Sequence, residues 1–112
     1  MYRILLVEDD DSLAALVKGH LESYDYAVSR CTQYERIPAA IGETQSQLVI
    51  LDVNLPRYDG FYICREIRRV SQIPVLFISA RSSSMDSIMG LSVGGDDYIS
   101  KPFSFELLTA KI

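Results

Sequence analysis

Three uninterrupted runs of apolar residues constrain the fold of this chain more than any other feature. They cover residues 4–7, 48–51 and 75–78. A strand with one face in water alternates apolar and polar residues, so runs without alternation indicate parallel strands that are covered on both faces. Two shorter apolar pairs, at residues 27–28 and 98–99, extend the pattern, and the sequence predicts a sheet of five parallel strands.

Between these runs, apolar residues recur three and four positions apart, which is the spacing of amphipathic helices. The clearest such segment, residues 12–24, turns Leu16 and its apolar neighbours inward. A second segment, residues 60–70, turns Phe61 inward and Arg68 outward. Further helices are expected at residues 34–41, 84–93 and 103–112.

Strands and helices therefore alternate along the chain. Parallel neighbours require right-handed crossovers, which place helices on both faces of one open sheet. We predict a doubly wound α/β fold on this basis. Since ligands of such sheets bind beyond the carboxyl ends of the strands, the residues that directly follow each strand are the ones to inspect for function.

Length and charge exclude several classes of protein. A chain of 112 residues has room for one core and no second domain. With 11 basic and 15 acidic residues, a net charge of −4, it lacks the cationic surface that nucleic-acid binding requires. The first apolar run is too short for a signal peptide or a membrane span, so we expect a cytoplasmic protein without membrane contact. Cys31 and Cys64 are far apart, and both are expected to be buried small apolar residues.

Charged side chains follow several of the predicted strands. Glu8 and Asp9 follow the first strand, Asp52 the third and Lys101 the fifth. Carboxylates brought within about 5 Å repel each other by roughly 3 kcal/mol per pair at an effective dielectric constant near 20, so they require a counter-charge. The ammonium of Lys101 can supply one, and oxygen ligands without nearby His or Cys favour Mg²⁺ over zinc as another.

Each of these groups also has a structural interpretation. Asp10 and Asp11 are expected only to cap the following helix, and Lys101 alone could be an exposed lysine before a turn. Asp52 is different, because an unpaired carboxylate directly after an apolar strand is costly unless something binds it. His20 lies within a helix, away from the strand ends, and is expected to be structural. Polar groups at several strand ends together indicate a functional site.

Five motifs stand at these strand ends and beside them. They are LLVEDD at residues 5–10, VILDVNLP at 49–56, DG at 59–60, ISA at 78–80 and GDDYISKPF at 95–103. In this order and spacing, over essentially the whole chain, they resemble the receiver domain of two-component response regulators. The resemblance implies the flavodoxin-like fold of CheY, with strand order 2-1-3-4-5.

The same resemblance implies a role for each residue at the strand ends. Asp52 is then the phospho-acceptor, which takes a phosphoryl group from the phosphohistidine of a sensor histidine kinase. Glu8, Asp9, Asp52 and the backbone carbonyl of Asn54 are the ligands of Mg²⁺. Lys101 neutralises charge on the phosphoryl oxygens.

A switch is implied as well. The hydroxyl of Ser79 donates to the phosphoryl group, and Tyr98 is the aromatic residue that moves in response, although Tyr98 alone would pass for an ordinary half-buried strand tyrosine. The chain is accordingly expected not to be an enzyme but a signalling switch that catalyses only its own phosphorylation and slow dephosphorylation. Asn54 and Arg81 are expected to tune the lifetime of the phosphoryl group.

The motif wording is closest to the OmpR/PhoB-like group of transcription regulators, and within it to the branch that responds to antimicrobial peptides and cell-envelope stress in Gram-positive bacteria. The resemblance implies a homodimer through the fourth helix, fifth strand and fifth helix, for which Asp97 and Lys111 form a candidate ion pair. Leu107 stands where an acid is common and Ser87 where a base is common. We therefore expect a more apolar or weaker dimer interface.

The last predicted helix reaches Ile112 after little more than two turns. We expect residues 1–112 to be a receiver domain cut short in that helix, with the DNA-binding domain of the parent protein absent. DNA would be contacted only through that second domain.

Two other functions remain open at this point. A phosphohydrolase of the haloacid dehalogenase type also uses a strand-end aspartate and Mg²⁺, but it requires an acid where Asn54 stands. A receiver-like interaction module that is never phosphorylated is disfavoured by the complete set of site residues. A nucleotide-binding enzyme is excluded, since no G-x-x-x-x-G-K-[ST] or G-x-G-x-x-G motif is present.

Overall fold

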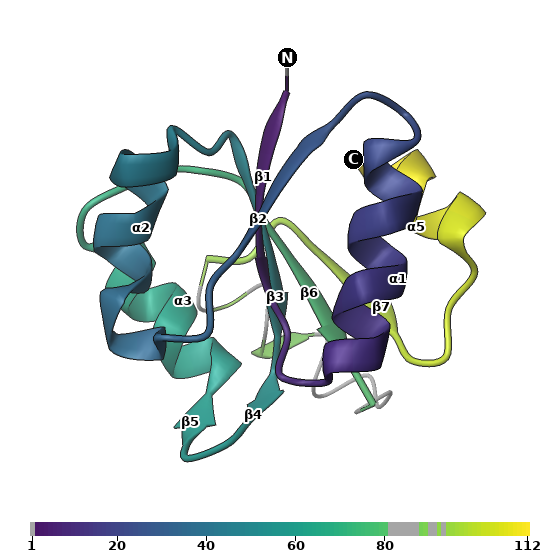
Figure 1. The fold of residues 1–112 in the computed structure, drawn as a ribbon. Helices are drawn as coiled ribbons and strands as arrows, with labels where there is room; N and C mark the ends of the chain where they lie inside the picture. Colours follow the sequence, from purple (N-terminus) through teal and green to yellow (C-terminus); the bar gives the residue numbers. More distant parts are fainter. Residues whose placement is uncertain (1, 81–87, 90–91, 93) are drawn as a thin grey trace.

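The main sheet is built from the apolar runs. Its strands are β1 (Arg3–Val7), β2 (Ala27–Arg30), β3 (Leu48–Asp52), β6 (Val75–Ser79) and β7 (Asp97–Ser100) in a computed structural model that describes residues 2–80, 88–89, 92 and 94–112. All neighbours are parallel, in the order β2-β1-β3-β6-β7 (Figure 1). Within this sheet that is the predicted order 2-1-3-4-5, so the predicted fold is confirmed.

Helices cover both faces of the sheet (Figure 1). The helices α1 (Asp11–Glu22) and α5 (Phe105–Lys111) lie on one face, and α2 (Ile37–Thr44) and α3 (Gly60–Arg68) lie on the other. A 3-10 turn, Tyr34–Arg36, precedes α2. Of the helix predicted at residues 84–93, the structure describes 88–89 and 92, which are helical, and the other positions lie outside the described residues.

Alternate residues of the central strands divide the core in two. Leu5 and Val7 of β1 pack into the cluster beneath α2 and α3, while Ile4 and Leu6 pack into the cluster beneath α1 and α5. All four side chains are at most 1% exposed. Burial on both faces explains why the apolar runs show no alternation.

A second, smaller sheet begins two residues after Asp52. Its strands, β4 (Asn54–Leu55) and β5 (Tyr58–Asp59), are antiparallel, and Arg57 in the turn between them has a φ of 65°. Two-residue strands have no measurable periodicity, and this ribbon was not predicted.

Three predicted side-chain positions are wrong. Leu16 is 59% exposed, and Ala14 occupies the inward position on α1 instead. Arg68 is not turned to solvent: its side chain is 17% exposed and donates hydrogen bonds to the carbonyl oxygens of Ile73 at 2.7 Å and Gly94 at 2.9 Å. Cys64 is buried as predicted, but Cys31 is only partly buried.

The structural interpretation of two groups near α1 agrees with the structure. Asp10 caps α1, since its Oδ1 accepts a hydrogen bond from the Leu13 N–H at 3.0 Å. His20 joins α1 to α5, with its ring stacked on Phe105 at 5.0 Å and its Nε2 2.9 Å from Thr109 Oγ1. None of the helices in the described part of the chain is long and apolar enough to span a membrane.

Candidate functional site

Polar side chains from four strands meet at the carboxyl edge of the main sheet. Glu8 directly follows β1, Asp52 ends β3, Ser79 ends β6 and Lys101 directly follows β7. The parallel register places Asp52 beside Ile78 and Ser79 beside Ser100. The structure thus brings together residues that lie up to 93 positions apart, from Glu8 to Lys101.

The ammonium of Lys101 contacts two buried carboxylates. Its Nζ donates a hydrogen bond to Asp52 Oδ2 at 3.0 Å and lies 2.8 Å from Glu8 Oε1. Asp52 is 2% exposed and Glu8 is fully buried. Partial burial by itself lowers the pKa of Lys101, but its contacts with the two carboxylates and their negative charges outweigh this effect and raise the pKa. The lysine is therefore held in its charged form.

Glu8 is buried with one carboxylate oxygen incompletely satisfied. Its Oε2 accepts a hydrogen bond from the Asp10 N–H at 3.1 Å. In the part of the chain that the structure describes, no donor makes a well-directed hydrogen bond to Oε1, so the contact with Lys101 is an ion pair only. Burial raises the pKa of Glu8, against the lowering influence of Lys101. A buried oxygen of this kind can accept a further cation.

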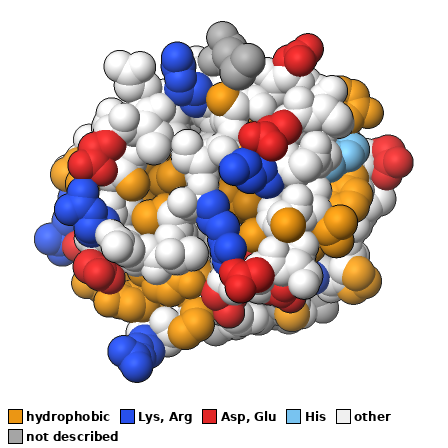
Figure 2. Space-filling view, in the orientation of Figure 1, with side chains coloured by type: hydrophobic (Ala, Val, Ile, Leu, Met, Phe, Trp, Pro, Cys, Tyr) orange, Lys and Arg blue, Asp and Glu red, His pale blue; other side chains and the backbone are white. Residues whose placement is uncertain are grey.

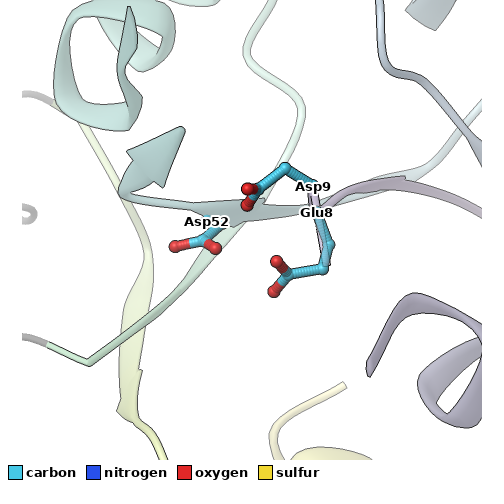
Figure 3. A group of neighbouring side chains, drawn as sticks. All are labelled: Glu8, Asp9 and Asp52. Carbon is cyan, nitrogen blue, oxygen red and sulfur yellow. The ribbon is translucent and has the colours of Figure 1, made fainter. Parts of the chain in front are cut away.

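Asp9 completes a group of three carboxylates. One oxygen from each of Glu8, Asp9 and Asp52 lies within 4.8 Å of the others, and Asp9 is exposed where the other two are buried. Figure 3 shows the carboxyl groups turned toward a common space beside the ends of β1 and β3. Carboxylate oxygens alone, open to water on one side, are the donor set that Mg²⁺ prefers. These residues could therefore hold a hard divalent cation.

The backbone around Asp52 is fixed by its neighbours. The Asn54 N–H donates to Asp52 Oδ1 at 3.0 Å, and the Gly60 N–H donates to the Val53 carbonyl oxygen at 2.8 Å. A Cβ atom at Gly60 would overlap the Asp52 carbonyl oxygen and lie 2.7 Å from Val53 Cα. A glycine at this position is thus what lets α3 begin against the end of β3, which accounts for the DG motif.

Ser79 and Tyr98 lie on the adjacent strands β6 and β7, where Tyr98 pairs with Phe77, two residues before Ser79. Ser79 is fully buried, and Asn54 Nδ2 lies 3.5 Å from its hydroxyl oxygen. Tyr98 is partly buried on the α3 side, with ring centroids 6.1 Å from Phe77 and 6.5 Å from Phe61. The ring of Tyr98 is therefore in contact with the core.

Arg30, at the end of β2, is a site residue that the sequence did not reveal. Its Nε and Nη2 donate to the Glu8 carbonyl oxygen at 3.0 and 2.6 Å, and its Nη1 donates to Asp11 at 2.7 Å. Arg30 therefore positions the backbone that carries the acidic group. The only available signal was a cation at the carboxyl end of a weakly predicted strand.

The two candidate dimer residues lie apart from this edge. Within the chain, Lys111 Nζ donates to Asp97 Oδ2 at 2.8 Å. Partial burial alone raises the pKa of Asp97, but this hydrogen bond and that of the Tyr98 N–H outweigh it and lower the pKa. Leu107, on the same helix as Lys111, is 44% exposed. Arg81 and Ser87 lie outside the described residues.

Comparison with known proteins gives a consistent result. The family model described as "Response regulator receiver domain" matches residues 4–112. The uncharacterised transcriptional regulatory protein YvcP of Bacillus subtilis is 51% identical over the whole chain, and the response regulator protein GraR of Staphylococcus haemolyticus is 44% identical over 98% of it. The chain spans 47% and 49% of these two relatives, about half of their length.

A solved structure agrees with both. The N-terminal domain of the nisin resistance regulator NsrR, a lantibiotic response regulator, superposes with a TM-score of 0.88 at 41% identity. The match covers 99% of this chain and 94% of that one.

Proposed function

This chain belongs to the response regulator receiver domain family, and we propose that it accepts a phosphoryl group on Asp52 from the phosphohistidine of a sensor histidine kinase. The observation that carries the proposal is the buried carboxylate of Asp52, 3.0 Å from the Lys101 ammonium and grouped with the carboxylates of Glu8 and Asp9. A phosphohydrolase of the haloacid dehalogenase type would need an acid at position 54, where this chain has Asn54, and the family match does not favour it.

The geometry fits Asp52 as the nucleophile. A carboxylate oxygen would attack phosphorus, the bond from phosphorus to the donor imidazole nitrogen would break, and that nitrogen would keep the electron pair. The Asn54 N–H and Lys101 hold the two carboxylate oxygens in place before the reaction. Lys101 also lies where it can neutralise charge on the phosphoryl oxygens, which is the main requirement of phosphoryl transfer. The proposed chemistry is limited to this phosphorylation and its slow reversal by water.

Glu8, Asp9, Asp52 and the backbone carbonyl of Asn54 are the proposed ligands of Mg²⁺. When bound, the ion supplies positive charge to the attacking and transferred oxygens. Without the ion, the Lys101 ammonium pairs with Glu8, and the hydrogen bonds from Arg30 to the Glu8 carbonyl oxygen hold the backbone of Glu8 in place.

Ser79 and Tyr98 are the proposed switch. The buried Ser79 hydroxyl can donate to a phosphoryl oxygen on Asp52, and the ring of Tyr98 would respond by changing its packing against Phe77 and Phe61. A dimer through the fourth helix, β7 and α5 would then use Asp97 and Lys111. Because these two residues pair within one chain, dimerisation would require them to exchange partners.

The output of the parent protein is a further proposal. Relatives about twice as long are named as transcriptional regulators, so we propose a second, DNA-binding domain and a role in transcription. We also propose a cytoplasmic regulator that responds to antimicrobial peptides and cell-envelope stress in a Gram-positive bacterium, which the likeness to NsrR, a nisin resistance regulator, supports.

Intact mass spectrometry after incubation with a small phosphodonor and Mg²⁺ tests the central proposal. We expect one alkali-labile phosphoryl adduct on the wild type and none on Asp52→Asn. Asp25→Asn, an exposed residue in the turn after α1, is the matched control and should be phosphorylated normally. An adduct that persists in Asp52→Asn would overturn the assignment, and continuous turnover of the donor would favour a hydrolase.

A further inference from the structure

A pocket on the α2–α3 side of the sheet takes no part in the site at the strand ends. It has a volume of about 280 Å³ and lies where the turn before α2 meets α3 and β5. On the face shown in Figure 2, hydrophobic side chains gather at the lower left, toward α3 and β5. Three tyrosines, two glutamates, one proline and one buried isoleucine line it: Tyr34, Tyr58, Tyr62, Glu35, Glu66, Pro38 and Ile63.

Two of the three tyrosine rings pack against each other. The centroids of Tyr34 and Tyr58 are 5.5 Å apart with an interplanar angle of 75°, so the edge of one ring meets the face of the other. Tyr62 is 54% exposed and presents its ring to solvent. The face of an aromatic ring carries negative charge density that attracts cations, and guanidinium groups also stack on it.

Two carboxylates stand beside these rings. Glu35 Oε2 accepts a long hydrogen bond of 3.4 Å from the Tyr58 hydroxyl. Glu66 Oε2 lies 3.3 Å from Arg69 Nε, in a surface pair whose arginine is 77% exposed. Such an exposed pair contributes little and can be exchanged for another cation. Partial burial and the negative charge of Asp9 also raise the pKa of Tyr34, so the acidic edge of the sheet adds to the negative potential here.

We propose that this pocket binds an arginine side chain presented by a partner protein. Its volume of about 280 Å³ lies just below the range of about 300–1,000 Å³ that is usual for small-molecule pockets, and suits one side chain. A guanidinium group can stack on tyrosine and pair with a carboxylate at the same time, which a lysine ammonium does less well. The pocket lies across the sheet from α5, so a partner bound here leaves Asp97 and Lys111 uncovered (Figure 1).

Nuclear magnetic resonance with ring-labelled tyrosine tests this proposal. The probe is N-acetyl-arginine amide, and N-acetyl-citrulline amide is the neutral control of nearly the same shape. We expect the arginine probe to shift the ring signals of Tyr34, Tyr58 and Tyr62 saturably at millimolar concentration, while Tyr2, Tyr24 and Tyr26 serve as internal references. The corresponding lysine compound, N-acetyl-lysine amide, should bind more weakly than the arginine probe. The citrulline probe should leave the signals unchanged. Mg²⁺ is included in the buffer because, on the proposed function, it would occupy the acidic edge and keep the arginine probe from binding there.

Charge-neutral variants identify the carboxylates. Glu35→Gln combined with Glu66→Gln should weaken binding about fivefold, as the loss of two partly exposed ion pairs would give. Glu22→Gln combined with Glu106→Gln removes the same charge from exposed positions on α1 and α5 and should change nothing. Asp52→Asn, which tests phosphorylation, should bind the probe within twofold of the wild type. Equal shifts from arginine and citrulline, or equal weakening by both double variants, would overturn the proposal.

Discussion

Lysine–aspartate pairs stand at both ends of β7, and they differ mainly in burial. At the start of the strand, Lys111 pairs with Asp97 at 2.8 Å, and after its end Lys101 pairs with Asp52 at 3.0 Å. The Asp97 side chain is 43% exposed, whereas that of Asp52 is 3% exposed and shares its lysine with the buried Glu8. The two distances are nearly equal, but the two contacts differ in kind. The Lys111–Asp97 pair is an exchangeable surface contact, whereas the Lys101–Asp52 pair neutralises charge that is buried.

Replacing each lysine in turn should give the largest difference in stability between the two pairs. Lys101→Met leaves two buried carboxylates without a cation, and in metal-free buffer we expect the free energy of unfolding to fall by about 3 kcal/mol. Lys111→Met should lower it by only about 0.5 kcal/mol. Urea denaturation with a chelator measures both, and added Mg²⁺ should restore part of the stability of Lys101→Met. Similar losses in both variants would mean that burial does not distinguish the pairs.

Two glycine substitutions make a similar comparison for the backbone, between a crowded position at Gly60 and an open one at Gly42. Gly60→Ala forces a methyl group against the Asp52 carbonyl oxygen and Val53 Cα, and we expect a loss of about 2 kcal/mol in the free energy of unfolding. Gly42→Ala, within α2, meets nothing within 4 Å and should gain up to about 1 kcal/mol from helix propensity. Thermal denaturation compares them. If Gly60→Ala left the free energy of unfolding unchanged, the end of β3 would be able to shift without cost.

The smallest expected effect is the pH dependence of the exposed pair. Because the pKa of Asp97 is lower in the folded chain than its ordinary 3.8, its contribution is present above that value and is lost as the pH falls through the folded-state pKa. The difference in unfolding free energy between wild type and Asp97→Asn should be about 0.5 kcal/mol at pH 7 and should vanish in stronger acid. Chemical denaturation across an acid pH series measures it. A difference that grows on acidification would contradict the sign.

The sequence was sufficient for the parts of the fold that depend on burial. Residues 48–51 and 75–78 are apolar because both faces of β3 and β6 are covered, so the strands and the meeting of Glu8, Asp52 and Lys101 could be predicted from the residues. The strand order came only from the family resemblance. Distances could not be predicted, nor could the incompletely satisfied oxygen of Glu8, since these depend on side-chain directions at the strand ends.

The failures at Arg68 and Arg30 share one physical cause. Arg68 and Arg30 are cations that donate hydrogen bonds to backbone carbonyl oxygens. Every residue type carries a backbone carbonyl, so the sequence does not show which carbonyl oxygens need a side-chain donor. A helix pattern therefore assigns Arg68 to solvent. The error at Leu16 is the opposite one, because this residue was predicted to be buried and is exposed. The smaller Ala14 fills the inward face of α1 instead.

The hydrogen bonds of Arg68 have a mechanical consequence. At the start of β7, Arg68 holds the Gly94 carbonyl oxygen and contacts Asp96 at 3.2 Å, while Asp96 in turn accepts a hydrogen bond from the Val75 N–H at 2.8 Å. After the end of β7, Lys101 is tethered to Asp52. With both ends of the strand anchored to other elements, β7 resists sliding along its own axis. If Asp52 is phosphorylated as we propose, we expect its signal to reach the α5 side by rotation of side chains such as Tyr98 rather than by translation of the strand.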